Sequence, residues 1–577
     1  MIVFVVHNDD PDRIHFTSTF IAMFTNLLPK FEHRNKSFYS FLVCLFLIPF
    51  QSNAAFRAGV FSVDVSPQKL PVIRNGSFLE NTADKLLDPL HARCFVFAEG
   101  GRQSAIVIVD SCMIPRTVAD KAKSLAMTQT GIPVNRILIS ATHCHSAPSV
   151  MNYCLGSRAD PEYTKLLPGK IAEAIQKAQQ SLQPAQAGWG SVDAGEFTSV
   201  RRWITRPDKT QKDPFGNETV RAMMHPGYQN PDYIMPSGPE DPELFLLSIL
   251  TAEGKPLGVL ANFSMHYFGG HPGVSADYCG AFSKRLEQIL AGNSKDFMAA
   301  MSQGTSGDLW WGDYSRSKKR TWSLDEYTGK LTQLAMGVIE KIQYSNSPSV
   351  VMAEKRIRLN RRLPDPSRVK WAEKLLQNFN PKEIRPRNRP EVYAEQVFYH
   401  IENSSEEVVL QALRIGEMGI TAIPCEIYAL TGLKLKLQSP LQNTFNISLA
   451  NGAAGYIPPP EQHRFGGYTT WPARTAGLET QAEPIIVETV LELLEEVSGQ
   501  PAKHYREPLS RYSRSILNDK PSVFWRVGEM GGDKALDASG NDQHGTYEGM
   551  IAFHLKGLES SPAESSKNSR SAYFASG

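Results

Sequence analysis

An apolar stretch that ends in two histidines is the feature that most constrains this chain. Residues 136–140, Arg-Ile-Leu-Ile-Ser, have the pattern of a buried β-strand, and His143 and His145 follow with one residue between them. Side chains of an extended segment alternate between two faces, so both imidazoles can point into one cleft. Such a pair is half of a metal site, although histidines at this spacing are as often structural. Further ligands have to come from elsewhere in the chain.

The segments before these histidines predict a sheet with helices packed on it. A strand pair is expected at residues 90–98 and 104–112, and a helix over residues 117–130 leads to the strand that carries His143. Strand, helix and strand in this order form a βαβ unit, and ligand sites in α/β proteins favour the carboxyl ends of such strands. We therefore expect an α/β body with a mixed sheet and a metal site at its strand ends.

Length and composition indicate a globular protein. The 577 residues are enough for two to four domains, or for one large body with appendages. A net charge of +2 gives no electrostatic case for nucleic acid as a partner. The seven cysteines include no C-x-x-C pair, which argues against a disulfide scaffold and against a cysteine-based zinc site.

Residues 1–55 are interpreted as an N-terminal extension followed by a secretory signal. Arg34 and Lys36 precede an apolar run at residues 38–50, and small residues of the kind that a signal peptidase accepts follow it. The run is short for a transmembrane helix, although an uncleaved membrane anchor is the alternative. Either way we expect an exported protein, secreted, periplasmic or attached to the envelope, with its true start at an internal methionine such as Met23.

Three residues with ligand chemistry follow predicted strands far downstream of the histidine pair. They are His266, Glu426 and Tyr456, and Glu426 is expected to open a helix of about a dozen residues. Together with a histidine they form an N and O ligand set that suits Zn²⁺ with a position left open for water. Taken singly, each has a structural alternative: a core histidine, a helix cap and a packed aromatic residue.

Eight motifs in order resemble the neutral/alkaline (non-lysosomal) ceramidase family between residues 57 and 497. The motifs are AGVFSVDVSP, DPLHARCFVF, SAIVIVDS, ISATHCHSAP, NFSMHYFGGHPGVSADYCG, SQGTSGD, LRIGEMGITAIPCE and NGAAGYIPP. One such motif would be a weak signal, whereas eight in the right order are specific. The resemblance implies a catalytic domain over residues 56–498 that hydrolyses the amide bond of an N-acyl lipid such as ceramide.

The same resemblance implies the site residues. The family's zinc ligands fall on His143, His266, Glu426 and Tyr456. The second histidine of the family's pair, which lies next to the metal, falls on His145. The substrate-positioning arginine and tyrosine fall on Arg202 and Tyr468, with Arg201 as the alternative register for the arginine.

One departure from the family affects the expected mechanism. Family members carry GDVSPN after the glycine loop, and its serine has been proposed as a nucleophile, whereas Trp310 replaces it here. If serine attack were required, this chain would be inactive, but water activated by Zn²⁺ does not depend on that residue. We therefore expect attack of metal-activated water on an amide carbonyl. Tyr468, with His145 or Arg202, would stabilise the oxyanion, and His145 would pass a proton to the leaving amine.

The C-terminal part is expected to be separate from the catalytic body. Residues 499–521 have the composition of a linker, and residues 522–577 resemble the opening strands of a concanavalin A-like, laminin-G-type module. About 55 residues are too few for a whole sandwich of this type, so a truncated all-β segment is expected. A partly disordered tail is the alternative.

Other functions remain open beside the ceramidase-like one. A related metal-dependent amidase or esterase could act on a different N-acyl or other small amide substrate. A non-catalytic binding protein of the same fold could contact a membrane surface or a carbohydrate, with Trp310 marking lost chemistry. Metal content separates the enzymes from the binding protein, and an assay of N-acylsphingosine against simpler amides separates the two enzymes.

Overall fold

A computed structural model describes residues 56–292, 296–377, 388–557 and 569–575. The predicted extension and secretory signal at residues 1–55 lie outside this part. The described residues belong to one compact unit, residues 54–577. Among them, no helix combines the length and the apolar character needed to cross a membrane. The domain boundaries expected near residues 498 and 521 stay predictions.

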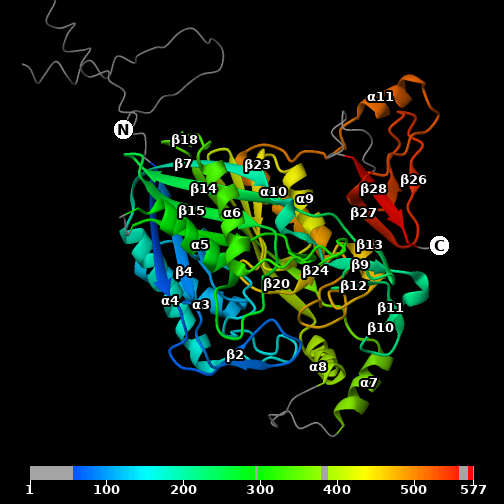
Figure 1. Ribbon diagram of the computed structural model, residues 1–577, viewed down its shortest axis with the longest axis horizontal. Coiled ribbons are helices and arrows are strands. Elements are labelled where there is room, and N and C mark those ends of the chain that lie inside the picture. Colours follow the sequence, from blue (N-terminus) through cyan, green and yellow to red (C-terminus); the bar gives the residue numbers. More distant parts are fainter. Residues whose placement is uncertain (1–55, 293–295, 378–387, 558–568, 576–577) are drawn as a thin grey trace, which may run out of the picture. The chain divides into compact units, whose positions relative to one another are not determined.

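A large mixed sheet forms the first layer of the body (Figure 1). Its order is β16 (Met298–Gln303), β15 (Pro256–Phe263), β14 (Glu243–Thr251), β7 (Gln183–Asp193), β1 (Arg57–Asp64), β4 (His91–Glu99), β5 (Arg102–Val109) and β6 (Ile137–Ala141), with β18 (Tyr344–Ser345) paired to β7. The pairs at its two ends, β15–β16 and β5–β6, are parallel. The edge strands β16 and β6 also approach each other. The sheet therefore curls until its two edges meet.

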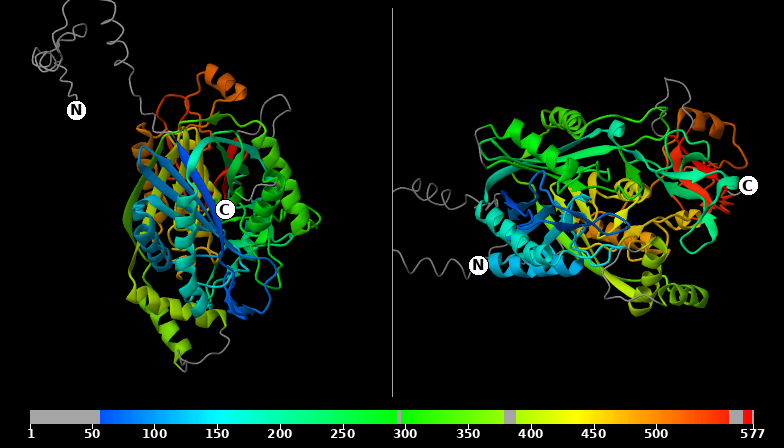
Figure 2. Two further views of the ribbon diagram at one scale, coloured as in Figure 1. Left: turned by 90° about the vertical axis from the view of Figure 1, so that its left-hand side faces the viewer. Right: turned by 60° about the horizontal axis from the view of Figure 1, so that its bottom comes forward.

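Helices cover the outer face of this sheet. Helices α3 (Arg116–Thr130) and α4 (Pro161–Gln180) pack on the half with β4 to β6, and α5 (Asp277–Leu290) and α6 (Leu324–Ile339) on the half with β14 to β16. The left view of Figure 2 shows the light-blue and the green helices on opposite sides. Strand alternation explains the two cores, because Val107 and Ile139 face α3 and α4 while Ile106 and Leu138 point inward.

A second sheet packs on the inner face of the first. Its order is β19 (Val350–Asn360), β20 (Ser405–Ile415), β21 (Met418–Ala422) and β23 (Asn443–Ile447). Helices α9 (Ala429–Gln438) and α10 (Ala482–Ser498) cover its far side. The layers are thus helices, sheet, sheet and helices, and the predicted α/β body with a mixed sheet is confirmed.

The segment just after β23 connects the two edges of the first sheet. The N–H of Ser448 donates to the carbonyl of Gln303 in β16 at 2.9 Å. The hydroxyl of Ser140 in β6 donates to the carbonyl of Ser448 at 2.9 Å. Ser448, the first residue after β23, therefore bonds to the carboxyl ends of both edge strands.

The local predictions around the ligands are partly confirmed. Strand β5, helix α3 and strand β6 form the expected βαβ unit, with β5 and β6 parallel. The prediction that a helix begins at Glu426 is wrong, because α9 begins at Ala429. Glu426 instead lies in β22 (Glu426–Ile427), which pairs in parallel with β24 (Tyr456–Ile457). The backbone has to stay extended at Glu426 because it makes this pairing.

Short strands and turns surround the strand ends. They are β2 (Val72–Arg74), β3 (Asn81–Ala83), β8 (Ser199–Val200), β9 (Arg202–Thr205), β10 (Gln211–Lys212), β11 (Glu218–Val220), β12 (Ala222–Met224), β13 (Tyr233–Pro236) and β17 (Leu309–Trp310), with 3-10 turns at Val134–Arg136, Gly195–Phe197, Pro207–Lys209 and Pro460–Phe465. Helices α7 (Pro366–Leu376) and α8 (Arg389–Glu402) pack on each other and project at the bottom of Figure 1.

Strands are the regular elements among the described residues from 522 onward. They are β25 (Lys534–Ala535), β26 (Gly545–Thr546), β27 (Ile551–Lys556) and β28 (Arg570–Phe574), and they follow helix α11 (Arg511–Asn518). Ala552 and Leu555 pack against Ile204 and Phe465 of the body. The resemblance of this segment to a laminin-G-type module stays a prediction.

Candidate metal centre

Three buried side chains converge where the two edges of the sheet meet. Nε2 of His143 lies 2.9 Å from Nε2 of His266 and 3.2 Å from Oε2 of Glu426. Nε2 of His266 lies 3.7 Å from the same oxygen. At most 3% of any of these residues is exposed. The structure thus brings together ligands that are separated by more than a hundred positions in the sequence.

The hydrogen bonds of the two imidazoles fix which nitrogen faces the cluster. Nδ1 of His143 donates to the carbonyl of Cys112 at 2.9 Å, and Nδ1 of His266 donates to the carbonyl of Ser306 at 3.0 Å. Each Nδ1 therefore carries a proton, which leaves the two Nε2 atoms to face each other. Two such nitrogens at this distance need a proton or a metal cation between them.

The carboxylate of Glu426 supports the same conclusion. Both of its oxygens are buried and accept no hydrogen bond, although buried polar atoms almost always have a partner. Two imidazole nitrogens with fixed tautomers and one unpartnered carboxylate form a donor set that fits a divalent metal ion. The residues present therefore fit the predicted metal.

A second possible group, Cys112 with His143 and His145, fits a metal less well. Burial raises the pKa of the Cys112 thiol well above its ordinary value, which disfavours the thiolate that a metal would need. Its sulfur also lies 3.7 Å from Nδ1 of His143, which is the nitrogen already used by a carbonyl. The set of His143, His266 and Glu426 is the better candidate.

The chain leaves β6 sharply in order to place the first ligand. His143 has a φ of 62°, in the left-handed region that non-glycine residues rarely adopt. Such backbone strain is often found at functional sites. It turns the imidazole away from the direction of the strand and towards His266.

The strand pairing between β22 and β24 brings the fourth predicted ligand to the cluster. Glu426 and Tyr456 are directly opposite in the parallel register. Burial raises the pKa of Tyr456 well above its ordinary value, and the charge of Glu426 raises it further. The Tyr456 hydroxyl accepts a hydrogen bond from Nη2 of Arg201 at 3.2 Å.

The structure places Arg201, and not Arg202, at the cluster. The guanidinium of Arg202 donates to the side chains of Ser237 and Gln462 and to the carbonyl of Gly466, all outside the cluster. Neighbouring residues of an extended segment point to opposite sides, which separates the two arginines. The alternative register named for the positioning arginine is therefore the one that reaches the ligands.

His145 lies beside the imidazole of His143. Its Nε2 is 3.2 Å from Nε2 of His143, and its ring stacks on Tyr267 with centroids 3.9 Å apart. Burial lowers its pKa well below the ordinary value, and the nearby His143 and Arg201 lower it further, so the imidazole is neutral. Gly76 packs tightly against this ring. Neither Tyr267 nor Gly76 was recognised in the sequence, although Tyr267 directly follows a predicted ligand.

Tyr468 borders the cluster without belonging to the metal group. Its ring packs edge-on against the rings of Tyr456 and Phe78, with centroids 5.9 Å and 5.4 Å apart. The guanidinium of Arg389 covers the ring of Phe78, with its Cζ 4.4 Å from the ring centroid. A row of aromatic side chains therefore leads from the buried ligands to exposed Arg389.

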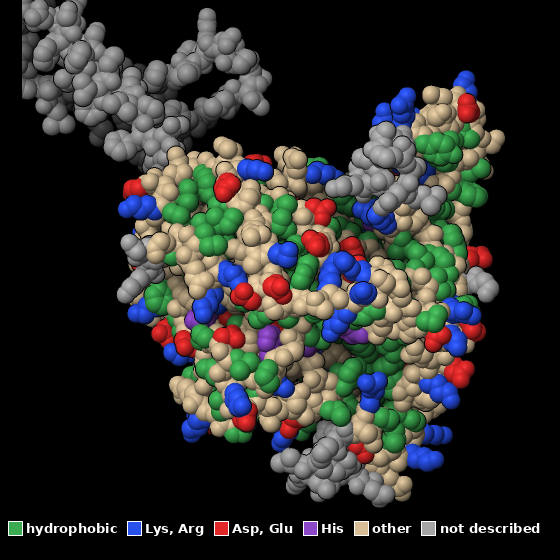
Figure 3. All heavy atoms as spheres, viewed as in Figure 1, with side chains coloured by type: hydrophobic (Ala, Val, Ile, Leu, Met, Phe, Trp, Pro, Cys, Tyr) green, Lys and Arg blue, Asp and Glu red, His purple; other side chains and the backbone are tan. Residues whose placement is uncertain are grey.

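Trp310 contributes to an aromatic wall on the side of Arg201. It pairs with Ser199 across β17 and β8, and Arg201 follows two residues later. The centroid of its indole lies 5.0 Å from the ring centroid of His225 and 6.1 Å from that of Tyr314. Its buried Nε1–H has no hydrogen-bond partner in the structure. Figure 3 shows histidine side chains in the middle of the face drawn there.

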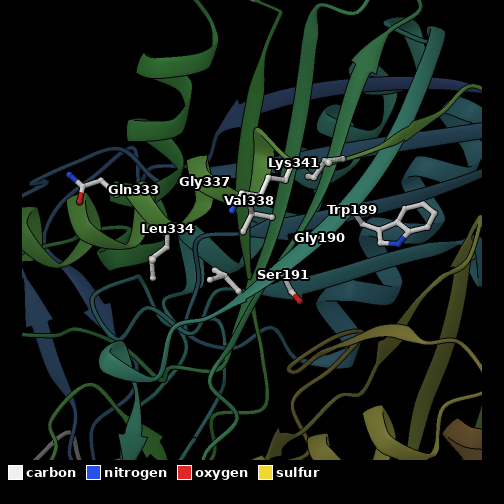
Figure 4. A pocket seen from close by; sticks show the side chains of 10 residues that line it. Trp189, Gly190, Ser191, Gln333, Leu334, Gly337, Val338 and Lys341 are labelled. Carbon is white, nitrogen blue, oxygen red and sulfur yellow. The ribbon is translucent and has the colours of Figure 1, made fainter. Parts of the chain in front are cut away.

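A separate cavity lies between β7 and α6. It has a volume of about 340 Å³ and is lined by Trp189, Gly190, Ser191, Val192, Gln333, Leu334, Gly337, Val338, Lys341 and Ile342. Figure 4 shows most of these residues. None of them carries an imidazole, a carboxylate or a thiol, so no chemistry is assigned to this cavity.

Comparison with known proteins agrees with the geometry. Over 270 residues the chain is 26% identical to the neutral ceramidase of Pseudomonas aeruginosa. The chain resembles the neutral ceramidases. This match covers 44% of the chain and 37% of the ceramidase, so it spans little more than a third of that protein. No known family profile matches the chain.

Solved ceramidase structures share the fold. The crystal structure of neutral ceramidase from Pseudomonas aeruginosa superposes with a TM-score of 0.56 and 16% identity over 78% of this chain and 76% of that one. A ceramidase complexed with C2 superposes with a TM-score of 0.58 and 16% identity over 78% and 77%. The resemblance to the neutral ceramidases that the motifs indicated is thereby confirmed.

Proposed function

We propose that this chain is an exported, zinc-dependent hydrolase that cleaves the amide bond of an N-acyl lipid of the ceramide type. The observation that carries the proposal is the convergence of the Nε2 atoms of His143 and His266 on the unpartnered carboxylate of Glu426. The similarity to neutral ceramidases supports the choice of an amide substrate.

The residues that would hold the metal are His143, His266, Glu426 and Tyr456. Zn²⁺ bound by N and O ligands supplies a Lewis acid that lowers the pKa of water to about 7. The carbonyls of Cys112 and Ser306 keep the two imidazoles oriented. Because all of these side chains are buried, the site also excludes bulk water from the reacting groups.

The remaining residues are suited to proton transfer and charge stabilisation. His145 is the candidate for moving a proton to the leaving amine, because its Nε2 lies beside the metal group, 3.2 Å from Nε2 of His143. Tyr468 and Arg201 can donate hydrogen bonds to the oxyanion that develops on the carbonyl. Each such donor contributes about 3 kcal/mol in comparable enzymes.

Export rests on the sequence of residues 1–55. A basic start, an apolar run and small residues in this order support a secretory signal. Expression of the full chain in a bacterial host, followed by fractionation and N-terminal sequencing of the product, tests it. Recovery of an unprocessed chain in the cytoplasm would contradict export.

Metal analysis and an amide assay test the function itself. We expect the purified protein to hold about one zinc ion and to release fatty acid from N-acylsphingosine, and His143→Ala to lose both properties. His400→Gln is a matched control, because His400 is a buried histidine that bonds to the carbonyl of Arg362 instead. A His143→Ala variant that is free of zinc and fully active would contradict the mechanism.

A related amidase with a different substrate is the second candidate. The observation in its favour is Trp310, whose bulk lies against His225 and Tyr314 at the wall beside Arg201. If the protein holds zinc and cleaves short N-acyl amides but not N-acylsphingosine, this second function is the correct one.

A further inference from the structure

A buried ion pair lies behind the candidate metal centre. The amine of Lys436 in α9 lies 2.7 Å and 2.9 Å from the two carboxylate oxygens of Asp241. Burial by itself lowers the pKa of Lys436, but the charges of Asp241 and Glu243 raise it above its ordinary value. The amine is therefore charged, and its buried partner Asp241 is a carboxylate that can only accept hydrogen bonds.

Asp241 also accepts hydrogen bonds from two hydroxyls beside the ligand His266. Oγ of Ser264 donates to Oδ2 of Asp241 at 2.9 Å, and Oγ1 of Thr305 donates to the same oxygen at 3.1 Å. The N–H of Thr305 donates in turn to Oγ of Ser264 at 3.0 Å. Because a carboxylate offers no proton, the direction of each of these bonds is fixed. One carboxylate oxygen thus orients both side chains.

The two hydroxyls belong to the segments that orient His266. Ser264 directly follows β15 and lies two residues before His266, whereas Thr305 lies just after β16 and directly precedes Ser306. The carbonyl of Ser306 accepts the hydrogen bond from Nδ1 of His266 at 3.0 Å. A metal-bound histidine depends on such a partner of its second ring nitrogen. A shift of Thr305 would therefore move the carbonyl that holds the imidazole.

Helix α9 connects the same ion pair to the ligand Glu426. This helix carries Lys436 and follows directly after the strand of Glu426, β22. Gly432 of α9 packs so closely on Thr305 that a methyl group on its Cα would clash with the threonine side chain. The loop after β16 is therefore held against α9 on one side and against the segment of His266 on the other.

We propose that Asp241 is a positioning residue that, with Lys436 as its counter-ion, keeps the ligands of the metal centre in place. This inference rests on the proposed metal site. Asp241 acts on His266 through the two hydroxyls and on Glu426 through α9, so its loss leaves every ligand in the chain but lets the loop after β16 turn. Metal is then bound less tightly, because hydrogen-bonded partners of metal ligands typically change metal affinity about 10- to 100-fold.

The metal affinity of Asp241→Asn tests this proposal, with Glu483→Gln as the matched control. Glu483 is buried in α10, and its carboxylate accepts from Lys434 and Thr431 of α9. Each variant thus deprives a mostly buried lysine of α9 of a charged partner.

Competition with a coloured chelator measures the dissociation constant for Zn²⁺, and thermal melting measures stability. We expect both variants to melt at a lower temperature than the wild type. Only Asp241→Asn should bind Zn²⁺ more weakly, by about tenfold or more. Equal losses of affinity in the two variants, or an unchanged affinity in Asp241→Asn, would overturn the proposal.

Thr305→Val and Thr305→Ser test the same contact without removing a charge. Valine keeps the shape of threonine but cannot donate to Asp241, whereas serine keeps the hydroxyl. We expect Thr305→Val to weaken metal binding and to alter the absorption of bound Co²⁺, and Thr305→Ser to keep the wild-type values.

This second pair of variants decides the question if Asp241→Asn does not fold. Equal metal affinities of Thr305→Val and Thr305→Ser would overturn the positioning role alone. A wild-type protein that binds neither Zn²⁺ nor Co²⁺ would overturn the metal site, and the positioning role with it.

Discussion

The backbone of Gly76 lies so close to the imidazole of His145 that a methyl group on its Cα would come within 2.4 Å of the ring's Cγ. Gly76 also has a φ of 89°. We expect Gly76→Ala to displace His145 and to lower kcat at least tenfold, because proton transfer depends on the position of the imidazole. Metal content should stay near that of the wild type.

Gly101→Ala is the matched control for this variant. Gly101 also has a positive φ, 78°, but no atom lies within 4 Å of its would-be methyl group. It therefore carries the same backbone strain without the clash. Equal kinetic losses in both variants would show that strain, and not the position of His145, determines the effect.

Zinc should stabilise the wild-type protein and should have little effect on Glu426→Gln. A metal present at a thousand times its dissociation constant adds about 4 kcal/mol to the free energy of unfolding. An amide oxygen is a much weaker ligand than a carboxylate, so the variant should gain little. Melting temperatures measured with zinc and with a chelator check this expectation. A full zinc-induced rise in the variant would exclude Glu426 as a ligand.

Ionisation of the buried Asp308 should lower the free energy of unfolding as the pH rises from about 4 to about 6. Burial raises its pKa to about 6 in the folded protein, against 3.8 in the unfolded chain, although hydrogen bonds such as that from the N–H of Ala429 lower it. In this window the folded state binds more protons than the unfolded state, so stability falls with increasing pH. The difference corresponds to about 3 kcal/mol, fully lost above pH 6.

Asp308→Asn keeps the acceptor for Ala429 and removes the titration. We expect it to melt at a higher temperature than the wild type at pH 7 and at a similar temperature at pH 4. Asp241→Asn should instead melt at a lower temperature than the wild type at pH 7, because it deprives the buried amine of Lys436, 2.7 Å from Asp241, of its charged partner. A parallel pH dependence of wild type and Asp308→Asn would contradict the assignment.

Trp310 should limit the size of the substrate. Trp310→Ala removes part of the wall beside Arg201, so we expect kcat/KM for long N-acyl lipids to rise about tenfold relative to that for short amides, as pocket contacts of this size allow. Trp310→Phe keeps an aromatic ring but removes the unpartnered Nε1–H, and it should change the ratio less. An unchanged ratio in Trp310→Ala would place Trp310 outside the substrate path.

The sequence was informative where local pattern determines position. His143 and His266 could be placed at strand ends because apolar runs precede them directly. The sequence places Glu426 at a helix start, since it does not reveal that Glu426 and Ile427 pair with Tyr456 and Ile457. Local pattern also leaves the choice between Arg201 and Arg202 open, because consecutive residues differ only in the face that they occupy.

Other features depend on contacts that no local pattern records. Gly76 lies in a loop between short strands, and its importance appears only when His145 is packed against it. The approach of β16 to β6 depends on the curvature of the whole sheet. The distances between the ligands follow from that curvature, and spacing along the chain does not encode them.

The bonds of Ser448 to both edge strands tie the metal site to the docking of the second sheet. This residue joins Gln303 to Ser140, so the strand ends that carry His143 and His266 are held together in part by a segment that is in place only when β23 is. Measured metal affinity therefore reports whether the two sheets have docked. A chain interrupted before residue 448 would lack the metal site even though both histidines had already been synthesised.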